Sequence, residues 1–157
     1  MKKYFTYIKA GLTILLLVFI IVDLSGGSFS KADIETVAAN TVKAAGMSDM
    51  TQAPGRMVKR FYGLNPKDYE GVVLYAPKDN MDAQELLIVK LKDISQQKSV
   101  EEAIQERLDT QLKSFEGYGA EQVALLNKHE LALEGNYIFY MVGEKAQVAR
   151  KAFKKSL

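Results

Sequence analysis

Few residues in the chain belong to the types that usually carry out catalysis or bind metals. His129 is the only histidine, and cysteine is absent. The absence of cysteine excludes disulfides, thiol nucleophiles and thiolate zinc sites, and a Ser-His-acid triad would have to be built around His129. Because His129 stands at the start of an expected strand, we interpret it as a structural or surface residue. The sequence contains no GxSxG, HExxH or Walker motif.

Carboxylates are the remaining groups with catalytic chemistry. A glycosidase-like pair needs two of them facing one cleft, with the pKa of one raised. Residues 33–157 contain 18 Asp and Glu residues, so some pair could always meet in space. Candidates for such a pair are Asp68, Glu70, Glu116 and Glu121. The pattern leaves a hydrolase open as an alternative, but it identifies no catalytic residue.

A second group of acids lies in the first half of an expected long helix and consists of Glu101, Glu102 and Glu106. Metal binding is one interpretation of such a cluster. However, the dipole of a helix favours negative charge near its N-terminus. We therefore interpret the three glutamates as a solvated helix start, and the sequence predicts no metal-binding or cofactor-binding residue.

Two aromatic loops punctuated by glycine are more distinctive. They are FYGLNPKDYEG at 61–71 and FEGYGAEQ at 115–122. Tyrosine combines a flat apolar area with a hydroxyl group and is enriched in contact surfaces. The alternative is that these tyrosines seal the edges of a small core and their hydroxyls bond loop carbonyls. As the candidate binding surface we name Tyr62, Asn65, Tyr69, Tyr118 and Gln122.

The N-terminal stretch at 5–24, FTYIKAGLTILLLVFIIVDL, decides the compartment in which these loops work. Its core at 10–22 carries no charge. As a helix this core covers roughly 20 Å, which is short of a hydrocarbon layer of about 30 Å and typical of a signal peptide. Lys9 can extend its charged end to the headgroups, and the nearby aromatic residues suit the membrane interface, so the full stretch can span the bilayer. We expect a retained anchor, and the alternative is a signal peptide cleaved after Ala32.

The charges around this stretch predict its orientation. Lys2, Lys3 and Lys9 precede it, whereas Asp23 and Lys31 follow. The positive-inside rule then places the N-terminus in the cytoplasm and the C-terminal domain outside the cell, on a single-pass anchor. The bilayer is a partner through residues 5–24. If the leader is cleaved, the domain is secreted.

Composition divides the chain into an anchor at 1–24, a linker at 25–32 and an extracytoplasmic domain at 33–157. The domain holds 17 of the 21 Lys and Arg residues and 18 of the 19 Asp and Glu residues, a net charge of −1. Nucleic-acid binding needs a clustered basic face. We therefore expect no nucleic-acid partner.

The sequence pattern of the domain predicts an α+β fold. Helical spacing occurs at 33–46, 51–63, 99–117 and from 144 onward, and strand patterns occur at 72–76, 85–92, 129–133 and 137–142. Ser99 with Glu102 predicts a capping box for the long helix, and Gly135-Asn136 predicts a type II′ hairpin. Two strand-strand-helix units predict a four-stranded, mainly antiparallel sheet with helices packed on one face, preceded by the N-terminal transmembrane helix.

Four runs of sequence occur in a recognisable order: YGLNPKDYEGVVLY, NMDAQELLIVKLKD, FEGYGAEQ and GNYIFYMV. Over about residues 33–153 the chain resembles a family of exported bacterial proteins classed as domain of unknown function 4358. The resemblance implies a membrane- or lipid-tethered envelope protein of Gram-positive bacteria, with no assigned activity, cofactor or catalytic residue. Many relatives look like lipoproteins, and this chain departs from them because it lacks cysteine.

The expected function is that of a membrane-anchored extracytoplasmic protein. We expect a non-catalytic binding or structural module of the cell envelope that contacts an envelope protein. Two alternatives stay open. One is an envelope hydrolase that uses paired carboxylates, and the other is a regulator of a neighbouring membrane protein that acts through the span itself.

Overall fold

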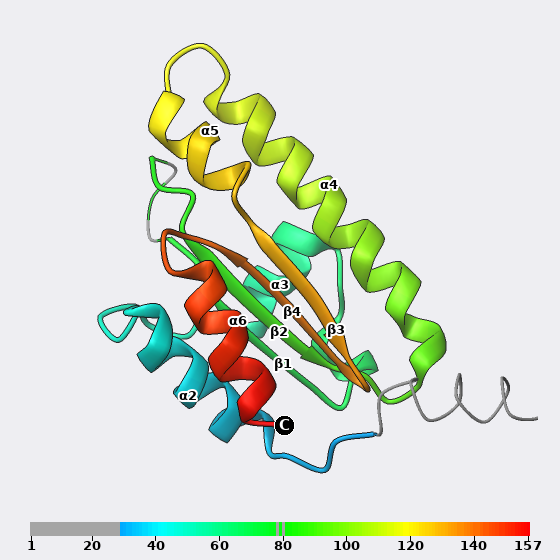
Figure 1. Cartoon of the computed structure of the whole chain (residues 1–157). Helices are drawn as coiled ribbons and strands as arrows, with labels where there is room; N and C mark the ends of the chain where they lie inside the picture. The colour runs from blue at the N-terminus through cyan, green and yellow to red at the C-terminus, as the bar shows by residue number, and fades with distance from the viewer. Residues whose placement is uncertain (1–28, 78, 80) are drawn as a thin grey trace, which may run out of the picture.

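The computed structural model describes residues 29–77, 79 and 81–157 of the chain. The predicted span at 5–24 and the first residues of the predicted linker, 25–28, lie outside this part of the chain. Among the described residues, no helix is long and apolar enough to cross a membrane. The described residues form an α+β structure around one sheet (Figure 1).

The sheet has four strands, β1 (Gly71–Tyr75), β2 (Glu85–Lys90), β3 (Glu130–Glu134) and β4 (Tyr137–Val142). Their order is β1-β2-β4-β3, and every neighbouring pair is antiparallel. The predicted four-stranded antiparallel sheet is therefore confirmed. β2 and β4 lie at its centre, and every residue of both strands is buried.

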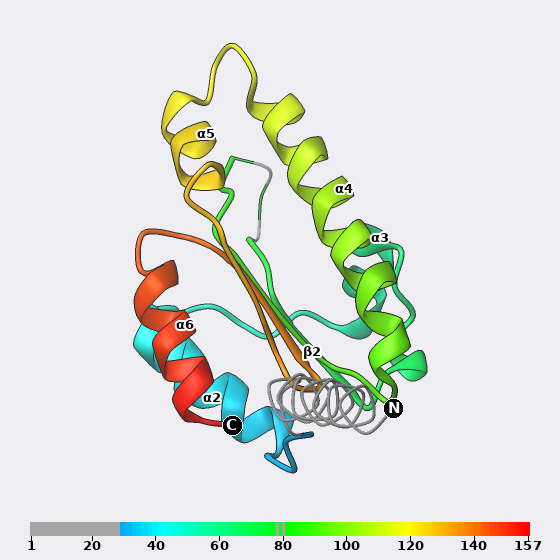
Figure 2. The ribbon, with the colours of Figure 1, turned by 45° about the vertical axis from the view of Figure 1, so that its right-hand side comes forward.

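Helices cover both faces of the sheet (Figure 2). Helices α2 (Ile34–Ala45) and α6 (Ala146–Lys155) pack on the face that carries Leu86 and Ile88. Helices α3 (Gly55–Tyr62), α4 (Gln97–Phe115) and α5 (Ala120–Leu126) pack on the face that carries Leu87 and Val89. The prediction that the helices pack on one face is therefore wrong. The central strands are apolar on both faces, and each apolar face has to be buried.

Local sequence explains the bounds of α2 and of the β3–β4 hairpin. Asp33 caps α2 by accepting a hydrogen bond from the Thr36 backbone N–H at 2.9 Å, and Gly46 ends the helix with a φ of 70°. Gly135 has a φ of 59°, whereas no residue other than glycine has a positive φ in the described chain. A positive φ at the first turn position alone is the type II′ geometry, as the sequence predicts.

The start of α4 differs from the prediction. The capping box is formed by Asp93 and Gln96 around a 3₁₀ helix, η2 (Ile94–Gln96), which runs directly into α4. Ser99 instead donates its hydroxyl to the carbonyl of Gln96 at 2.8 Å. The Ser99–Glu102 capping box is therefore wrong, because the helix already begins at Gln97.

The regions around α3 and α5 also differ from the prediction. The chain stays extended before α3, because the Ala53 N–H donates to Leu74 O at 2.7 Å and Gln52 pairs with Tyr75 at the edge of β1. The helix therefore begins only at Gly55, after Pro54. Helix α5 lies in a stretch for which the sequence predicts neither a helix nor a strand.

Candidate functional site

A cleft of about 330 Å³ lies between α3, α4 and the loop that joins β1 to β2. Its lining combines two arginines with amide, hydroxyl and aromatic side chains. The lining residues that matter below are Arg60 and Phe61 of α3, Asp82 of the loop, and Arg107, Gln111 and Phe115 of α4.

An ion pair between Arg107 and Glu85 supports the cleft from beneath. Arg107 Nε donates to Glu85 Oε1 at 3.2 Å, and Arg107 Nη2 donates to Glu85 Oε2 at 2.8 Å. The Glu85 side chain is fully buried, while 13% of the Arg107 side chain is exposed. A buried carboxylate is costly unless it is paired and hydrogen-bonded. The two-point contact meets this need and fixes Arg107 where it lines the cleft.

Two buried tyrosines lie beside this ion pair. The Tyr62 hydroxyl donates a hydrogen bond to Glu85 Oε1. Burial raises the pKa of Tyr62 well above its ordinary value of 10.0, and the negative charge of Glu85 raises it further. Burial also raises the pKa of Tyr140, again with a contribution from Glu85. Both phenols are therefore neutral near pH 7, and Tyr62 serves as a hydrogen-bond donor rather than as a base.

Arg107 also remains protonated and positively charged. Burial lowers its pKa, but the hydrogen bonds and charge of Glu85 raise it, and the net direction is upward. The Phe61 ring adds a further attraction, because its centroid lies 4.2 Å from Arg107 Cζ and 6.0 Å from Arg60 Cζ. Cation–π contacts of this kind hold a guanidinium in place. The cleft is thus preorganised around two arginines and one aromatic ring.

Two buried polar atoms near the cleft have no hydrogen-bond partner within the described residues. They are Gln111 Oε1 and the Tyr140 hydroxyl. Gln111 lies on α4 four residues after Arg107 and also lines the cleft. Leaving a buried polar group unpaired costs about 1–3 kcal/mol. A hydrogen-bond donor supplied by a ligand or by water would recover this energy at Gln111.

The acids of the cleft belong to its loop. Asp79 Oδ1 accepts a hydrogen bond from the Met81 N–H and Asp82 Oδ1 accepts one from the Gln84 N–H, both at 2.9 Å. Such contacts are typical of turns in which an Asp side chain bonds the backbone two residues on. Among the described residues, no three His, Asp or Glu side chains lie close enough together to hold a metal ion. The arrangement is suited to hydrogen bonding and ion pairing.

Three of the five predicted binding residues lie around this cleft. Tyr62 is buried beneath it and bound to Glu85. Tyr118 is 63% exposed, and its ring centroid lies 6.0 Å from that of Phe115 in the cleft wall. Gln122 accepts a hydrogen bond from the Ala83 N–H at 2.9 Å, next to the cleft residue Asp82. Of these three residues, Tyr118 has the largest exposed fraction and is therefore the most accessible to a partner.

The other two predicted residues lie toward the opposite end of α4. The Asn65 amide donates to Asp68 Oδ1 at 3.0 Å, and the carbonyl of Asp68 accepts a hydrogen bond from Gln96, directly before α4. Tyr69 is buried. The structure therefore divides the first aromatic loop, because Phe61 and Tyr62 lie at the cleft with the second loop, whereas the rest of the first loop lies near the start of α4.

His129 directly precedes β3, where the sequence predicts a strand to begin. Its Nδ1 lies 2.8 Å from the carbonyl oxygen of Leu126, and its ring centroid lies 5.8 Å from that of Tyr140. The ring is partly buried. These contacts fit the interpretation of His129 as a structural residue.

The sequence reasoning missed Glu85, Arg107 and Gln111. A usable pattern was present, because Arg107 and Gln111 follow Ile104 by three and seven residues on the buried side of α4. Polar residues at such positions must find partners in the core. Likewise, Glu85 begins a strand whose remaining residues up to Val89 are apolar. What the sequence does not contain is the information that these two segments meet.

Comparison with known proteins assigns the central part of the chain. Residues 43–143 match the family described as Domain of unknown function (DUF4358). The matched range includes all the cleft residues named above and both residues of the buried ion pair. No curated protein and no solved structure matches the chain.

Proposed function

The chain belongs to the family described as Domain of unknown function (DUF4358), and from its own residues we propose that it is a membrane-anchored, extracytoplasmic binding module of the bacterial cell envelope. The anchor is the stretch at 5–24, which stays in the membrane with its N-terminus in the cytoplasm. The domain at 33–157 then faces the envelope. Its partner is an envelope protein.

Composition supports this location. The uncharged core at 10–22 is preceded by three lysines, a pattern that keeps an N-terminus inside the cell. The chain has no cysteine that could carry a lipid, so the apolar stretch is the tether that the sequence offers.

The observation that carries the binding role is the cleft between α3 and α4. It is preorganised by the Arg107–Glu85 ion pair, and Gln111, which lines it, has a buried amide oxygen without a partner among the described residues. Tyr118 stands next to it, exposed to solvent. Preorganised charge, an unsatisfied acceptor and an exposed tyrosine are features of a contact surface. A donor-bearing side chain of a partner protein fits this combination.

Site-specific photocrosslinking in living cells tests the proposal. A benzophenone amino acid is placed at Tyr118 and, in a second strain, at Arg60, both at the cleft. The matched control carries it at Val148 of α6, which is 54% exposed and belongs to a helix on the opposite face of the sheet. We expect one adduct of the same mass from both cleft positions, identified by mass spectrometry, and none from position 148.

Two outcomes would count against the proposal. Equal adducts from all three positions would show nonspecific contact, and no adduct from either cleft position would show that the cleft has no protein partner. A regulator that acts through the span instead predicts that function is lost when residues 1–28 are exchanged for an unrelated anchor. The cleft proposal expects function to survive that exchange.

The cleft lining does not include the carboxylates that the sequence offers for a hydrolase, Asp68, Glu70, Glu116 and Glu121, so a hydrolase at the cleft would have to use Asp79 and Asp82, which line it. Each carboxylate already accepts a backbone hydrogen bond within its own loop. A hydrolase would require activity on an envelope polymer that disappears in an Asp82→Asn variant with unchanged stability. The binding proposal expects no such activity in either protein.

A further inference from the structure

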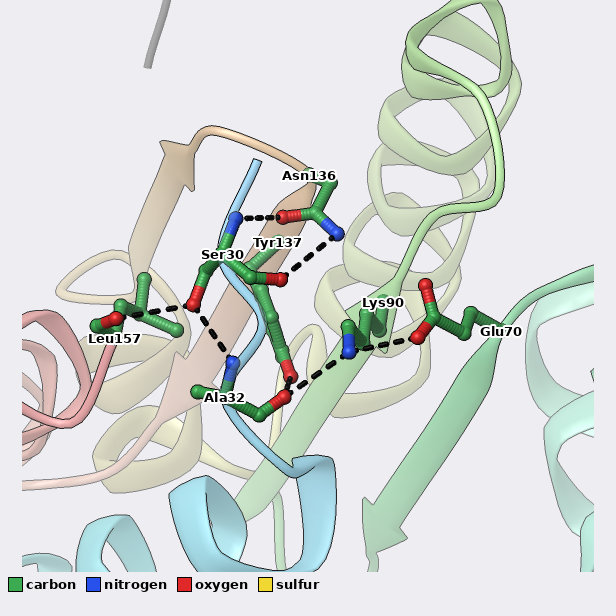
Figure 3. A network of polar contacts seen from close by, with 7 residues as sticks. All are labelled: Ser30, Ala32, Glu70, Lys90, Asn136, Tyr137 and Leu157. Atoms are coloured by element: carbon green, nitrogen blue, oxygen red, sulfur yellow. Dashed lines mark hydrogen bonds and ion pairs between the residues drawn. The ribbon is translucent and has the colours of Figure 1, made fainter. Parts of the chain in front are cut away.

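The segment just before α2, residues 30–32, is bound to the sheet by a network of hydrogen bonds (Figure 3). We call residues 30–32 the strap. The Ser30 N–H donates to Asn136 Oδ1 at 2.8 Å, and Asn136 Nδ2 donates back to Ser30 O at 3.4 Å. The carbonyl of Ala32 accepts hydrogen bonds from Tyr137 Oη at 2.6 Å and Lys90 Nζ at 3.0 Å.

The partners of the strap are residues of the core. Lys90, Asn136 and Tyr137 are all buried, and their polar groups reach the strap from β2, the hairpin turn and β4. Lys90 also forms an ion pair with Glu70 at 2.7 Å. Buried polar groups that lost these partners would each cost stability. The strap is therefore part of the folded domain rather than a flexible linker.

The strap also touches the C-terminus of the chain. The Ser30 hydroxyl donates to the carbonyl of Leu157 at 3.0 Å and accepts a hydrogen bond from the Ala32 N–H at 3.1 Å. The beginning and the end of the domain thus meet at one end of the sheet, and Figure 3 shows both beside the β3–β4 turn. The direction in which the chain enters the domain is fixed by these contacts.

This end of the molecule, which we call the hairpin end, consists of Phe29, Gly135, Asn136 and Ile94. Leu91 N–H donates to Asn136 O at 2.8 Å, which places the β2–η2 connection beside the hairpin turn. Phe29 is 56% exposed and Ile94 is 47% exposed. Two large apolar side chains are thus presented to solvent at the end where the chain enters.

The charges near the hairpin end are balanced, so the end has no strong preference for one sign of charge. Lys90 pairs with Glu70 at 2.7 Å, and Lys154 pairs with Glu134, the residue before the turn, at 3.1 Å. Along the chain, Lys31 and Asp33 belong to or follow the strap, and Lys92 and Asp93 precede Ile94. Aromatic and aliphatic side chains flanked by mixed charges suit the boundary between lipid headgroups and water.

We propose that the hairpin end lies on the outer surface of the lipid bilayer, with Phe29 and Ile94 in the headgroup region, and that the strap fixes the domain in this orientation. The inference rests on the retained anchor of the proposed function. Only four residues lie between Phe29 and Leu24, the last residue of the span, so the five steps along the chain place the two at most about 18 Å apart. The headgroup layer itself takes up about 5–8 Å of that reach.

Depth measurement with single labels tests this proposal on the full chain. Because the chain has no cysteine, the variants Ile94→Cys and Glu116→Cys each accept one environment-sensitive fluorophore. The two positions stand before and after the 19-residue helix α4, a helix about 28 Å long. Each labelled chain is reconstituted into phosphatidylcholine–phosphatidylglycerol vesicles that carry a nitroxide quencher on a fraction of the headgroups.

We expect quenching at position 94 to be at least twice that at position 116, and a Phe29→Ser change to reduce it at position 94. Equal quenching at both positions, or none at either, in chains that float with the vesicles would overturn the proposed orientation and leave the anchor intact. Chains that fail to float with the vesicles would overturn the anchor, and the bilayer contact with it. Circular dichroism of each labelled chain confirms that it is folded.

Discussion

Arg107 of α4 and Glu85 of β2 are joined by two hydrogen bonds of 3.2 and 2.8 Å, and the glutamate is fully buried. The pair ties α4, the longest of the described helices, to the first residue of a central strand. Tyr62 of α3 donates a third hydrogen bond to the same carboxylate. Helices α3 and α4, which line the cleft, are therefore both held to β2 by one acidic side chain.

We predict that an Arg107→Met change destabilises the protein by about 3–5 kcal/mol, because it leaves a buried carboxylate without its cation. Urea denaturation of the full chain in detergent micelles, followed by circular dichroism, measures the free energy of unfolding. Lys113→Met on the exposed side of the same helix serves as the control and should change stability by less than about 0.5 kcal/mol.

A double variant separates the ion pair from simple packing. Glu85→Leu combined with Arg107→Met replaces both charges by apolar groups, and such replacements of a buried pair are often neutral. We expect the double variant to be more stable than Arg107→Met alone. A double variant that is less stable than the single one would show that the loss came from packing rather than from the unpaired charge.

Tyr140, beside the same ion pair, makes the stability of the protein depend on pH in the alkaline range. Burial raises its pKa above the ordinary value of 10.0, so above about pH 10 the folded state holds a proton that the unfolded state loses. The free energy of unfolding therefore falls as pH rises from about 10 toward the raised value, and this contribution to the pH dependence is absent below that range. Tyr62 contributes in the same direction.

We predict that Tyr140→Phe raises the free energy of unfolding by about 1–3 kcal/mol at pH 8, because the buried hydroxyl that it removes has no partner among the described residues. Above pH 10 the variant should lose stability less steeply than the parent chain. Denaturation curves at pH 8, 10 and 11 provide the comparison. Parallel losses in the two proteins would show that Tyr140 does not titrate with a raised pKa.

The periodicity of the sequence predicts the elements of this fold well but not their arrangement in layers. The apolar runs of β2 and β4 and the Gly135 turn depend on neighbouring residues, and both are found as predicted. The distribution of helices on two faces depends on which apolar stripe meets which side of the sheet. That choice is made by contacts between distant segments, which a single sequence does not contain.

The candidate site shows the same limit. Tyr118 and Gln122 were named from their residue types, and both lie near the cleft. Residue type did not separate them from Tyr69, which is buried near the other end of α4. Glu85 and Arg107 are 22 residues apart, and only the antiparallel packing of α4 on the sheet brings their charges together.

We predict opposite results for two tyrosines of the candidate surface. Tyr62→Ala removes a buried ring and a hydrogen bond to Glu85, and should cost about 3–5 kcal/mol of stability. Tyr118→Ala removes an exposed ring and should change stability by less than about 0.5 kcal/mol. Thermal denaturation of both variants, combined with crosslinking from position 60, distinguishes folding from binding. A loss of the adduct in Tyr118→Ala with unchanged stability would assign Tyr118 to the contact surface.

The strap is expected to contribute to stability through Asn136. An Asn136→Ala change removes the acceptor of the Ser30 N–H and the donor to the Ser30 carbonyl, so we predict a loss of about 1–3 kcal/mol. The control is Asn127→Ala, since Asn127 is exposed. Equal stability of the two variants would show that the strap is not held by these hydrogen bonds.

The strap also bears on whether the leader is removed. Cleavage after Ala32 would separate the Ala32 carbonyl from Asp33 and so from the domain, leaving Tyr137 Oη and Lys90 Nζ without the acceptor that they share. A peptidase also needs this segment extended and accessible, whereas the folded domain holds it against β4. We therefore predict that the protein extracted from membranes retains residues 30–32, as intact-mass spectrometry would measure. A dominant species that begins at Asp33 would contradict both the retained anchor and the structural role of the strap.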